Sequence, residues 1–233
     1  MAYLPIFLDV TGRRCIVIGG GEIAARKVTS LLDAGAEVSV ISPTLVEALA
    51  ALARDGRIIY MQRSYETDDM TGAALVYAAT DDSELHQRLY VEARRHSIPI
   101  NIADVPSLCT FIVPATLTRG SLQIAVSTEG ASPAMAKRII ARIERLFGPE
   151  YGLALEVMRA ARHHLKATEP DLRMRASKLT ALARSRIPEY LRKGNLDALD
   201  RKLLREIGIG LDALGLSRIC RDHPPVESTS TAR

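Results

Sequence analysis

Residues 16–23 decide the fold, and they run Ile16-Val17-Ile18-Gly19-Gly20-Gly21-Glu22-Ile23. A β-branched apolar run passes into three glycines and then into a helical pattern. This is the arrangement of the phosphate-binding turn in a dinucleotide-binding βαβ unit. Gly19 permits a tight turn off the strand, and Gly21 lets the backbone approach a pyrophosphate closely. The first N–H groups of the next helix would point at that anion, so we expect a nucleotide site here.

The flanking sequence supports the same interpretation. A helical pattern over 22–32 has an apolar face, Ala34-Gly35-Ala36 ends it, and 37–41 has the pattern of a second parallel strand. That strand ends in Ser42-Pro43-Thr44, without the acidic residue that often holds a ribose hydroxyl. An acidic residue therefore does not decide between NAD and NADP.

The first half alternates further strands with helices. We expect strands over 57–62, 74–79 and 98–102, and a helix over 83–96 capped by Asp82 or Ser83. The alternation predicts an α/β class with a Rossmann-like, mostly parallel sheet. In such a sheet a ligand lies beyond the carboxyl ends of the strands. Four segments fall there and are expected to form one crevice: Gly19 to Ile23, Pro43-Thr44, Thr80-Asp81, and Asn101 to Asp104.

The pattern changes after residue 113. Residues 111–115 and 122–127 look like two antiparallel strands joined at Arg119-Gly120, and a helix is expected over 134–147 with Pro133 at its first turn. A short strand pair cannot bury itself alone, so we expect a small α+β dimerisation segment, the alternative being a helix that packs only on its own hairpin. The predicted organisation is a Rossmann-like domain over 1–113, this segment over 114–148, a helical basic domain over 149–216, and a disordered tail over 217–233.

Composition limits the class of protein. The chain has 233 residues, 47% of them hydrophobic and 25% charged, which is typical of a soluble protein. It has no apolar run long enough to span a membrane and no signal-peptide pattern over 1–9, so a cytoplasmic protein is expected. The net charge is +4, with basic residues concentrated after residue 131. This favours an anionic partner, and the scarcity of aromatics and absence of Trp favour a polycarboxylate small molecule over nucleic acid. The alternative is that these residues only form the solvated basic faces of helices.

The metal-ligating residue types predict little. Cys15, Cys109 and Cys220 are too widely spaced for a zinc site or a disulfide framework, and Cys15 is expected to be a packing residue. His86 and His96 are expected to flank a surface helix, and the pair His163-His164 points in two directions. Because no two histidines have the i, i+4 spacing of a helical metal site, we predict no permanently bound metal.

Taken together, the motifs resemble one family. Those that carry the resemblance are Leu4-Pro5-Ile6-Phe7-Leu8, Gly19-Gly20-Gly21 with Ala24-Ala25-Arg26-Lys27, Asn101-Ile102-Ala103-Asp104, the run Cys109 to Ala115, Ser127, and Ala131-Ser132-Pro133-Ala134. The chain is similar to the precorrin-2 dehydrogenase/sirohydrochlorin ferrochelatase family of siroheme biosynthesis, over about residues 1 to 195. Some relatives carry an added uroporphyrinogen methyltransferase. Because 233 residues are too few for it, the resemblance is to the stand-alone form.

The resemblance implies two reactions at one site. Precorrin-2 loses hydride to NAD and becomes sirohydrochlorin, and ferrous iron, a substrate and not a resident metal, is then inserted to give siroheme. The family's cofactor positions correspond to Glu22, Ile23, Pro43 and Thr44. We expect Gly19, Gly20, Gly21, Ser42 and Thr80 to complete the NAD site. The family's important aspartate corresponds to Asp104, and a homodimer is implied.

Asp104 is the candidate catalytic residue, because both reactions release protons that a carboxylate could accept. An ordinary Asp titrates near 3.9, so an efficient base would need burial to raise its pKa. The other interpretation of Asp104 is a structural loop-capping residue. For the whole protein, the alternatives are a dehydrogenase without chelatase activity and a dinucleotide-sensing module that binds NAD without turnover.

Overall fold

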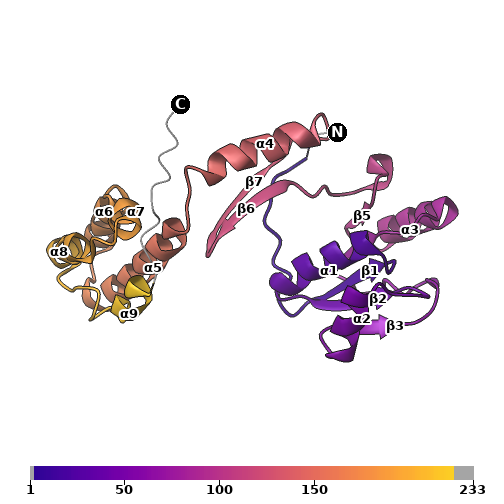
Figure 1. The fold of residues 1–233 in the computed structure, drawn as a ribbon, viewed down its shortest axis with the longest axis horizontal. Coiled ribbons are helices and arrows are strands. Elements are labelled where there is room, and N and C mark those ends of the chain that lie inside the picture. Colours follow the sequence, from indigo (N-terminus) through magenta and orange to yellow (C-terminus); the bar gives the residue numbers. More distant parts are fainter. Residues whose placement is uncertain (1–2, 223–233) are drawn as a thin grey trace. The chain divides into compact units, whose positions relative to one another are not determined.

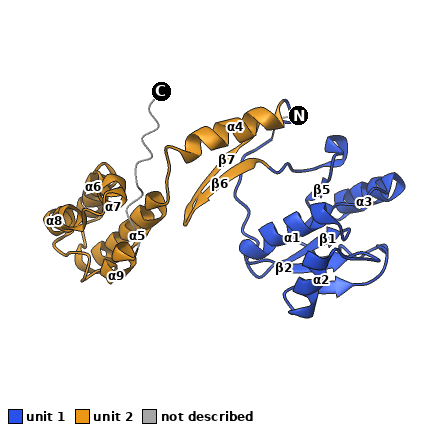
Figure 2. Cartoon of the chain, viewed as in Figure 1, with its two compact units in different colours: residues 1–113, 129–131 blue, residues 114–128, 132–233 orange. Residues whose placement is uncertain are grey.

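The computed structural model describes residues 3–222, which divide into two compact units (Figures 1 and 2). Unit 1 comprises residues 1–113 and 129–131, and unit 2 comprises residues 114–128 and 132–233. Among the described residues, no helix combines the length and the apolar character needed to cross a membrane.

Unit 1 is a parallel sheet of five strands in the order β3-β2-β1-β4-β5. Its elements are β1 (Arg14–Ile18), α1 (Glu22–Asp33), β2 (Glu37–Ile41), α2 (Glu47–Arg54), β3 (Ile59–Met61), β4 (Leu75–Ala78), α3 (Ser83–Arg95) and β5 (Ile100–Ile102). The chain winds outward from β1 in one direction and then restarts at β4 on its other side. The direction in which successive strands are added therefore reverses between β1 and β4. In doubly wound sheets, ligands bind beyond the carboxyl ends of the strands at such a point.

Alternate residues of β1 supply the cores on both faces of this sheet. Cys15 and Val17 belong to the cluster that contains Val28 of α1 and Leu49 of α2. Ile16 and Ile18 belong to the cluster that contains Leu89 of α3. Because successive strand side chains point to opposite faces, the continuous apolar run Cys15 to Ile18 is what a strand covered by helices on both sides requires. The α/β prediction is confirmed, and Cys15 is a fully buried packing residue as expected.

Unit 2 begins with an antiparallel hairpin followed by helices. Its elements are β6 (Ala115–Arg119), β7 (Leu122–Val126), α4 (Pro133–Glu144), α5 (Glu150–Thr168), α6 (Leu172–Ala183), α7 (Ile187–Arg192), α8 (Leu196–Ile207) and α9 (Ser217–Arg221). Arg119 pairs with Leu122 across the turn, and Gly120 takes a φ of +56° there. Helices α5 to α9 enclose a separate apolar core.

Two expectations about element boundaries are wrong. Residues 111–114 are not a strand, and β6 starts only at Ala115, because the segment before it is bonded to β5. Residues 217–221 are not part of a disordered tail but form α9, since Leu216 and Cys220 are buried in the helical core of unit 2. The rest of the predicted tail, from residue 223, lies outside the described residues.

Candidate functional site

The turn between β1 and α1 is as tight as its three glycines suggest. Gly19 has a φ of +116°, and a Cβ there would lie 2.2 Å from the carbonyl oxygen of Ala79. A Cβ on Gly20 would lie 1.9 Å from the carbonyl oxygen of Thr44. These two glycines let the chain pass between the ends of β4 and β2. Gly21 differs, because a Cβ there would meet no described atom within 4 Å.

The end of β2 is bound directly to this turn. The N–H of Val46 donates to the carbonyl oxygen of Gly20 at 2.8 Å. The hydroxyl of Ser42 donates to the carbonyl oxygen of Thr44 at 2.7 Å, and Ser42 is buried. Pro43 and Thr44 are exposed beside the glycines. Ser42 therefore shapes the turn, and the side chains that a ligand can reach are those of Pro43 and Thr44.

The end of β4 is fixed by a buried histidine. Nε2 of His86 lies 2.9 Å from the carbonyl oxygen of Thr80 and 3.1 Å from its hydroxyl. The expectation that His86 lies at the surface is wrong: only 6% of it is exposed, because α3 turns this residue toward the strand that precedes it. The side chain of Asp82 accepts a hydrogen bond from the N–H of Leu85, which confirms the predicted helix cap.

Asp104 lies just beyond β5, with an exposed side chain and a left-handed φ of +59°. The motif after it explains how this loop is held. The N–H of Thr110 donates to the carbonyl oxygen of Ile100 at 2.8 Å, and the N–H of Ile100 donates to the Thr110 hydroxyl at 2.8 Å. The amide of Asn101 donates to the carbonyl oxygen of Phe111 at 3.0 Å. These bonds hold the segment from Cys109 to Phe111, which follows the Asp104 loop, along β5. We call residues 109–111 the strap.

The buried Cys109 thiol completes this strap. Its Sγ accepts from the N–H of Ile102 at 3.2 Å and lies 3.3 Å from the carbonyl oxygens of Ile102 and Val105. Burial raises the pKa of Cys109, so the thiol stays protonated at neutral pH. A neutral buried thiol is a structural group and not a nucleophile.

One residue near the glycine turn receives no role from sequence reasoning. Lys27 of α1 is partly buried, with Nζ 4.9 Å from the centre of the Tyr77 ring, and Tyr77 packs edge-on against Phe111. Burial, with the neighbouring charge of Arg26, lowers the pKa of Lys27. Tyr77 thus contacts Lys27 on one side and Phe111 on the other, which links α1 to β4 and to the strap. The only sequence signal for it is Lys27 on the inner side of an otherwise apolar helix face.

All of the predicted site residues of unit 1 lie at one edge of its sheet. Gly19 to Ile23, Ser42 to Thr44, Thr80 and Asp104 follow β1, β2, β4 and β5, whose carboxyl ends share that edge because the strands are parallel. The basic residues after 131 belong to unit 2. They are not brought to this edge within unit 1.

The edge fits a dinucleotide. Gly21, the N-cap of α1, has no side chain that could cap the helix, so the first N–H groups of α1 are left for another acceptor. Space is open in front of Gly21, and a pyrophosphate placed there would face those donors and the positive end of the helix dipole. A glycine cradle, uncapped donors and a topological switch point together define a dinucleotide-binding protein of the Rossmann type.

The comparisons with known proteins find two matching families. Residues 6–115 match the family described as "Putative NAD(P)-binding", and residues 119–146 match the family described as "Sirohaem biosynthesis protein central". The chain is thus similar to siroheme synthases, and its first unit matches an NAD(P)-binding domain.

Relatives named siroheme synthase support this assignment. The protein of Thioalkalivibrio sulfidiphilus is 36% identical over 212 residues, which cover 91% of this chain and 43% of that protein. The protein of Methylobacillus flagellatus is 46% identical over 152 residues, covering 65% and 32%. The chain thus spans less than half the length of these relatives. A solved structure, "SirC, precorrin-2 dehydrogenase", has the same fold, with a TM-score of 0.70 at 24% identity over 88% of this chain and 98% of that one.

Proposed function

We propose that the chain catalyses the NAD-dependent oxidation of precorrin-2 to sirohydrochlorin. The observation that carries the proposal is the shared edge of unit 1, where the uncapped N-terminus of α1 and the exposed carboxylate of Asp104 follow strands of one parallel sheet. The similarity to siroheme synthases and the fold shared with a precorrin-2 dehydrogenase agree with this proposal.

The cofactor would bind through the backbone at the glycine turn. Gly19, Gly20 and Gly21 would bring the chain close to the pyrophosphate, and the N–H groups of Glu22 and Ile23 would donate to it. Pro43 and Thr44 would border one side of the cofactor and Thr80 the other, while Ser42 would hold the Thr44 carbonyl in place. NAD, when bound, accepts a hydride from the reduced tetrapyrrole.

Asp104 would accept the proton that the tetrapyrrole loses when its hydride leaves. The side chain is exposed in the described chain, so the low-dielectric surroundings that a base needs would have to come from the bound tetrapyrrole itself. The strap from Cys109 to Phe111 would fix the Asp104 loop against β5, which keeps the carboxylate in one position.

We propose iron insertion into sirohydrochlorin as the second activity. Ferrous iron enters as a substrate, the tetrapyrrole nitrogens supply its ligands, and two pyrrole protons leave as siroheme forms. Asp104 is the group at this edge that could take those protons in turn. The alternatives are a dehydrogenase without chelatase activity and a dinucleotide sensor without turnover.

The further parts of the proposal concern unit 2 and assembly. We propose that the hairpin and α4 form a dimerisation segment, that α5 to α9 form a basic helical domain, and that arginines in this half pair with the substrate carboxylates. Exposed apolar residues support dimerisation: Met135 and Ile139 of α4 are 49% and 38% exposed, and Leu146, just beyond its end, is 64% exposed. We also propose that the enzyme is cytoplasmic.

The experiment that tests the proposal uses purified protein and precorrin-2 under anaerobic conditions, with and without NAD. Absorbance follows sirohydrochlorin and NADH, and ferrous iron is then added. We expect NAD-dependent sirohydrochlorin with stoichiometric NADH, and then siroheme faster than in protein-free solution. Iron insertion no faster than in protein-free solution would overturn the chelatase proposal and leave the dehydrogenase proposal standing. NAD binding with no turnover of precorrin-2 would overturn the enzyme proposal in favour of the sensor.

A further inference from the structure

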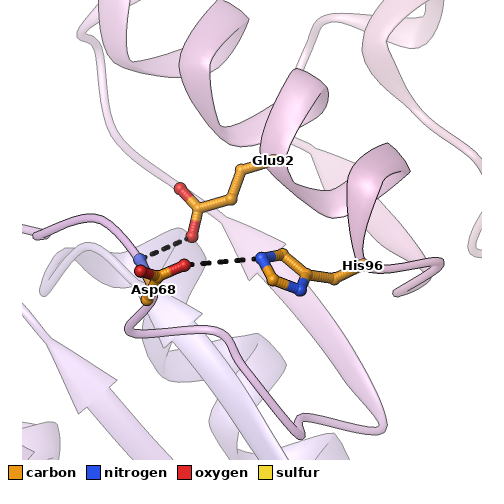
Figure 3. Close-up of side chains that lie close together, drawn as sticks. All are labelled: Asp68, Glu92 and His96. Carbon is orange, nitrogen blue, oxygen red and sulfur yellow. Dashed lines mark hydrogen bonds and ion pairs between the residues drawn. The ribbon is translucent and has the colours of Figure 1, made fainter.

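Three side chains with metal-ligating atoms meet elsewhere on unit 1 (Figure 3). Asp68 comes from the loop between β3 and β4, Glu92 from the last turns of α3, and His96 caps that helix. One ligand atom from each lies within 4.8 Å of the other two. Helix α3 begins after the carboxyl end of β4 and ends before the amino end of β5. The cluster is therefore at the opposite end of α3 from Thr80 and the nucleotide edge.

The imidazole of His96 has an ion-pair contact with Asp68 but no hydrogen bond at its buried nitrogen. Its Nε2 atom is buried and makes no hydrogen bond within the described chain. An unpaired buried nitrogen costs free energy, and such atoms are rare in folded proteins. Oδ1 of Asp68 lies 3.5 Å from Nε2. Two ligands about 2.1 Å from one tetrahedral ion stand about 3.4 Å apart, so this pair already has the separation that a shared ion would impose.

Glu92 is held in place by groups outside the triad. The hydroxyl of Tyr65 donates to Oε1 at 2.7 Å, and the N–H of Asp68 donates to the same oxygen at 2.8 Å. Burial and the bond to Glu92 raise the pKa of Tyr65, so its hydroxyl remains a donor at neutral pH. Both bonds are made to Oε1, the oxygen that faces Asp68 in Figure 3, so they fix the Glu92 carboxylate beside the other two side chains. Outer groups of this kind orient metal-binding carboxylates.

We propose that Asp68, Glu92 and His96 form a binding site for a divalent transition cation of the Zn²⁺ type. One imidazole nitrogen and two carboxylate oxygens suit Zn²⁺, whereas Mg²⁺ and Ca²⁺ prefer oxygen alone. The cation would join the β3–β4 loop to the end of α3 and leave the nucleotide edge untouched. This proposal departs from the sequence prediction of no resident metal, and it does not depend on the proposed function.

The test uses the tag-free, full-length protein after chelator treatment. Calorimetry follows Zn²⁺ binding, visible absorption follows Co²⁺, and thermal unfolding is measured with Zn²⁺ or Mg²⁺. We expect one Zn²⁺ per chain and tetrahedral Co²⁺ bands. Zn²⁺ at a hundredfold excess over Kd should raise Tm by roughly 5–10 °C, and Mg²⁺ should not. His96→Gln and Asp68→Asn should each weaken Zn²⁺ binding by about tenfold or more.

The matched control is His163→Gln, which removes an exposed histidine of α5 and should leave Zn²⁺ binding unchanged. Asp68→Asn tests the proposal even if His96→Gln folds poorly, because Asp68 is exposed and Asn tolerates its φ of +71°. No Zn²⁺ binding would overturn the proposal and leave His96 as the ion-pair partner of Asp68. Binding that survives both triad variants, or that is lost in the control, would overturn it equally.

Discussion

A methyl group added to Gly20 would lie 1.9 Å from the carbonyl oxygen of Thr44, so the turns after β1 and β2 touch through their backbones. The hydrogen bond from Val46 to the Gly20 carbonyl closes the same contact from the other side. Gly20 is therefore a packing requirement of the fold. Gly21 has open space before it, so packing does not require it, and we propose that the bound pyrophosphate does.

This contrast between neighbouring glycines predicts different effects of the same substitution. Gly20→Ala should destabilise unit 1 by about 3 kcal/mol and lower Tm by roughly 5–10 °C, because backbone atoms cannot move aside. Gly21→Ala should change Tm by less than about 2 °C but weaken NAD binding roughly tenfold or more, because its Cβ enters the pyrophosphate space. Thermal unfolding and NAD titration of both variants check this. If the two variants had the same Tm and the same loss of NAD affinity, the prediction would be contradicted.

Replacing Asp104 separates its chemical role from a structural one. Asp104→Asn keeps the shape and tolerates the left-handed backbone, so folding and NAD affinity should be retained. The dehydrogenase rate should fall about 100-fold or more if the carboxylate accepts the proton. Asp55→Asn, which removes an exposed carboxylate at the end of α2, is the matched control and should keep the full rate. A full rate in Asp104→Asn would leave Asp104 as a loop residue.

Buried phenol and thiol groups predict a loss of stability at high pH. Burial raises the pKa of Tyr77 to about 12 from an ordinary value of 10.0, and it also raises the pKa of Cys15, Cys109 and Cys220. Between the two pKa values the folded chain binds more protons than the unfolded chain. Stability is therefore complete below the unfolded pKa and falls as pH rises through this window, by about 1.4 kcal/mol per pH unit for each such group.

Tyr77→Phe isolates one of these groups. The ring that contacts Phe111 and Lys27 is retained while the titrating hydroxyl is lost. Between pH 10 and 12, denaturant unfolding should show a slope shallower by about 1.4 kcal/mol per pH unit, with little change at pH 7.5. An unchanged alkaline slope would show that the Tyr77 hydroxyl ionises equally in both states.

The sequence predicted those features that local pattern determines. The apolar run of β1, the glycine turn, strand β2 over Glu37–Ile41 and the Asp82 cap of α3 are all confirmed. Each depends on neighbouring residues, through side-chain period or capping chemistry. The convergence of four strand ends at one edge also follows, because parallel pairing is implied by the alternation of elements.

The features that the sequence did not predict depend on contacts between distant residues. Residues 111–114 have the apolar pattern of a strand, yet the Asn101 side chain takes the carbonyl of Phe111 and binds that segment to β5. His86 is buried because of the direction in which α3 leaves β4. Helix α2 was not predicted, and the meeting of Asp68 with His96 joins residues 28 apart in the sequence (96 − 68). Contacts between residues so far apart cannot be predicted from the pattern of neighbouring residues in the sequence.

An exposed apolar stripe, formed by Met135 and Ile139 of α4 and by Leu146 just beyond its end, provides the test of assembly. The opposite side of this helix from the stripe also faces solvent, at Ala141, while Ala136 is buried. If Met135, Ile139 and Leu146 meet a second copy of the chain, Ile139→Glu should place a charge in an apolar interface and shift the dimer toward monomer, raising the dimer Kd by about 100-fold or more. Ala141→Glu adds the same charge away from the stripe and should remain dimeric. Light scattering over a concentration series measures both. A wild-type chain that is monomeric at every concentration would contradict the dimer. A dimer that both variants keep would show that the subunit interface lies elsewhere.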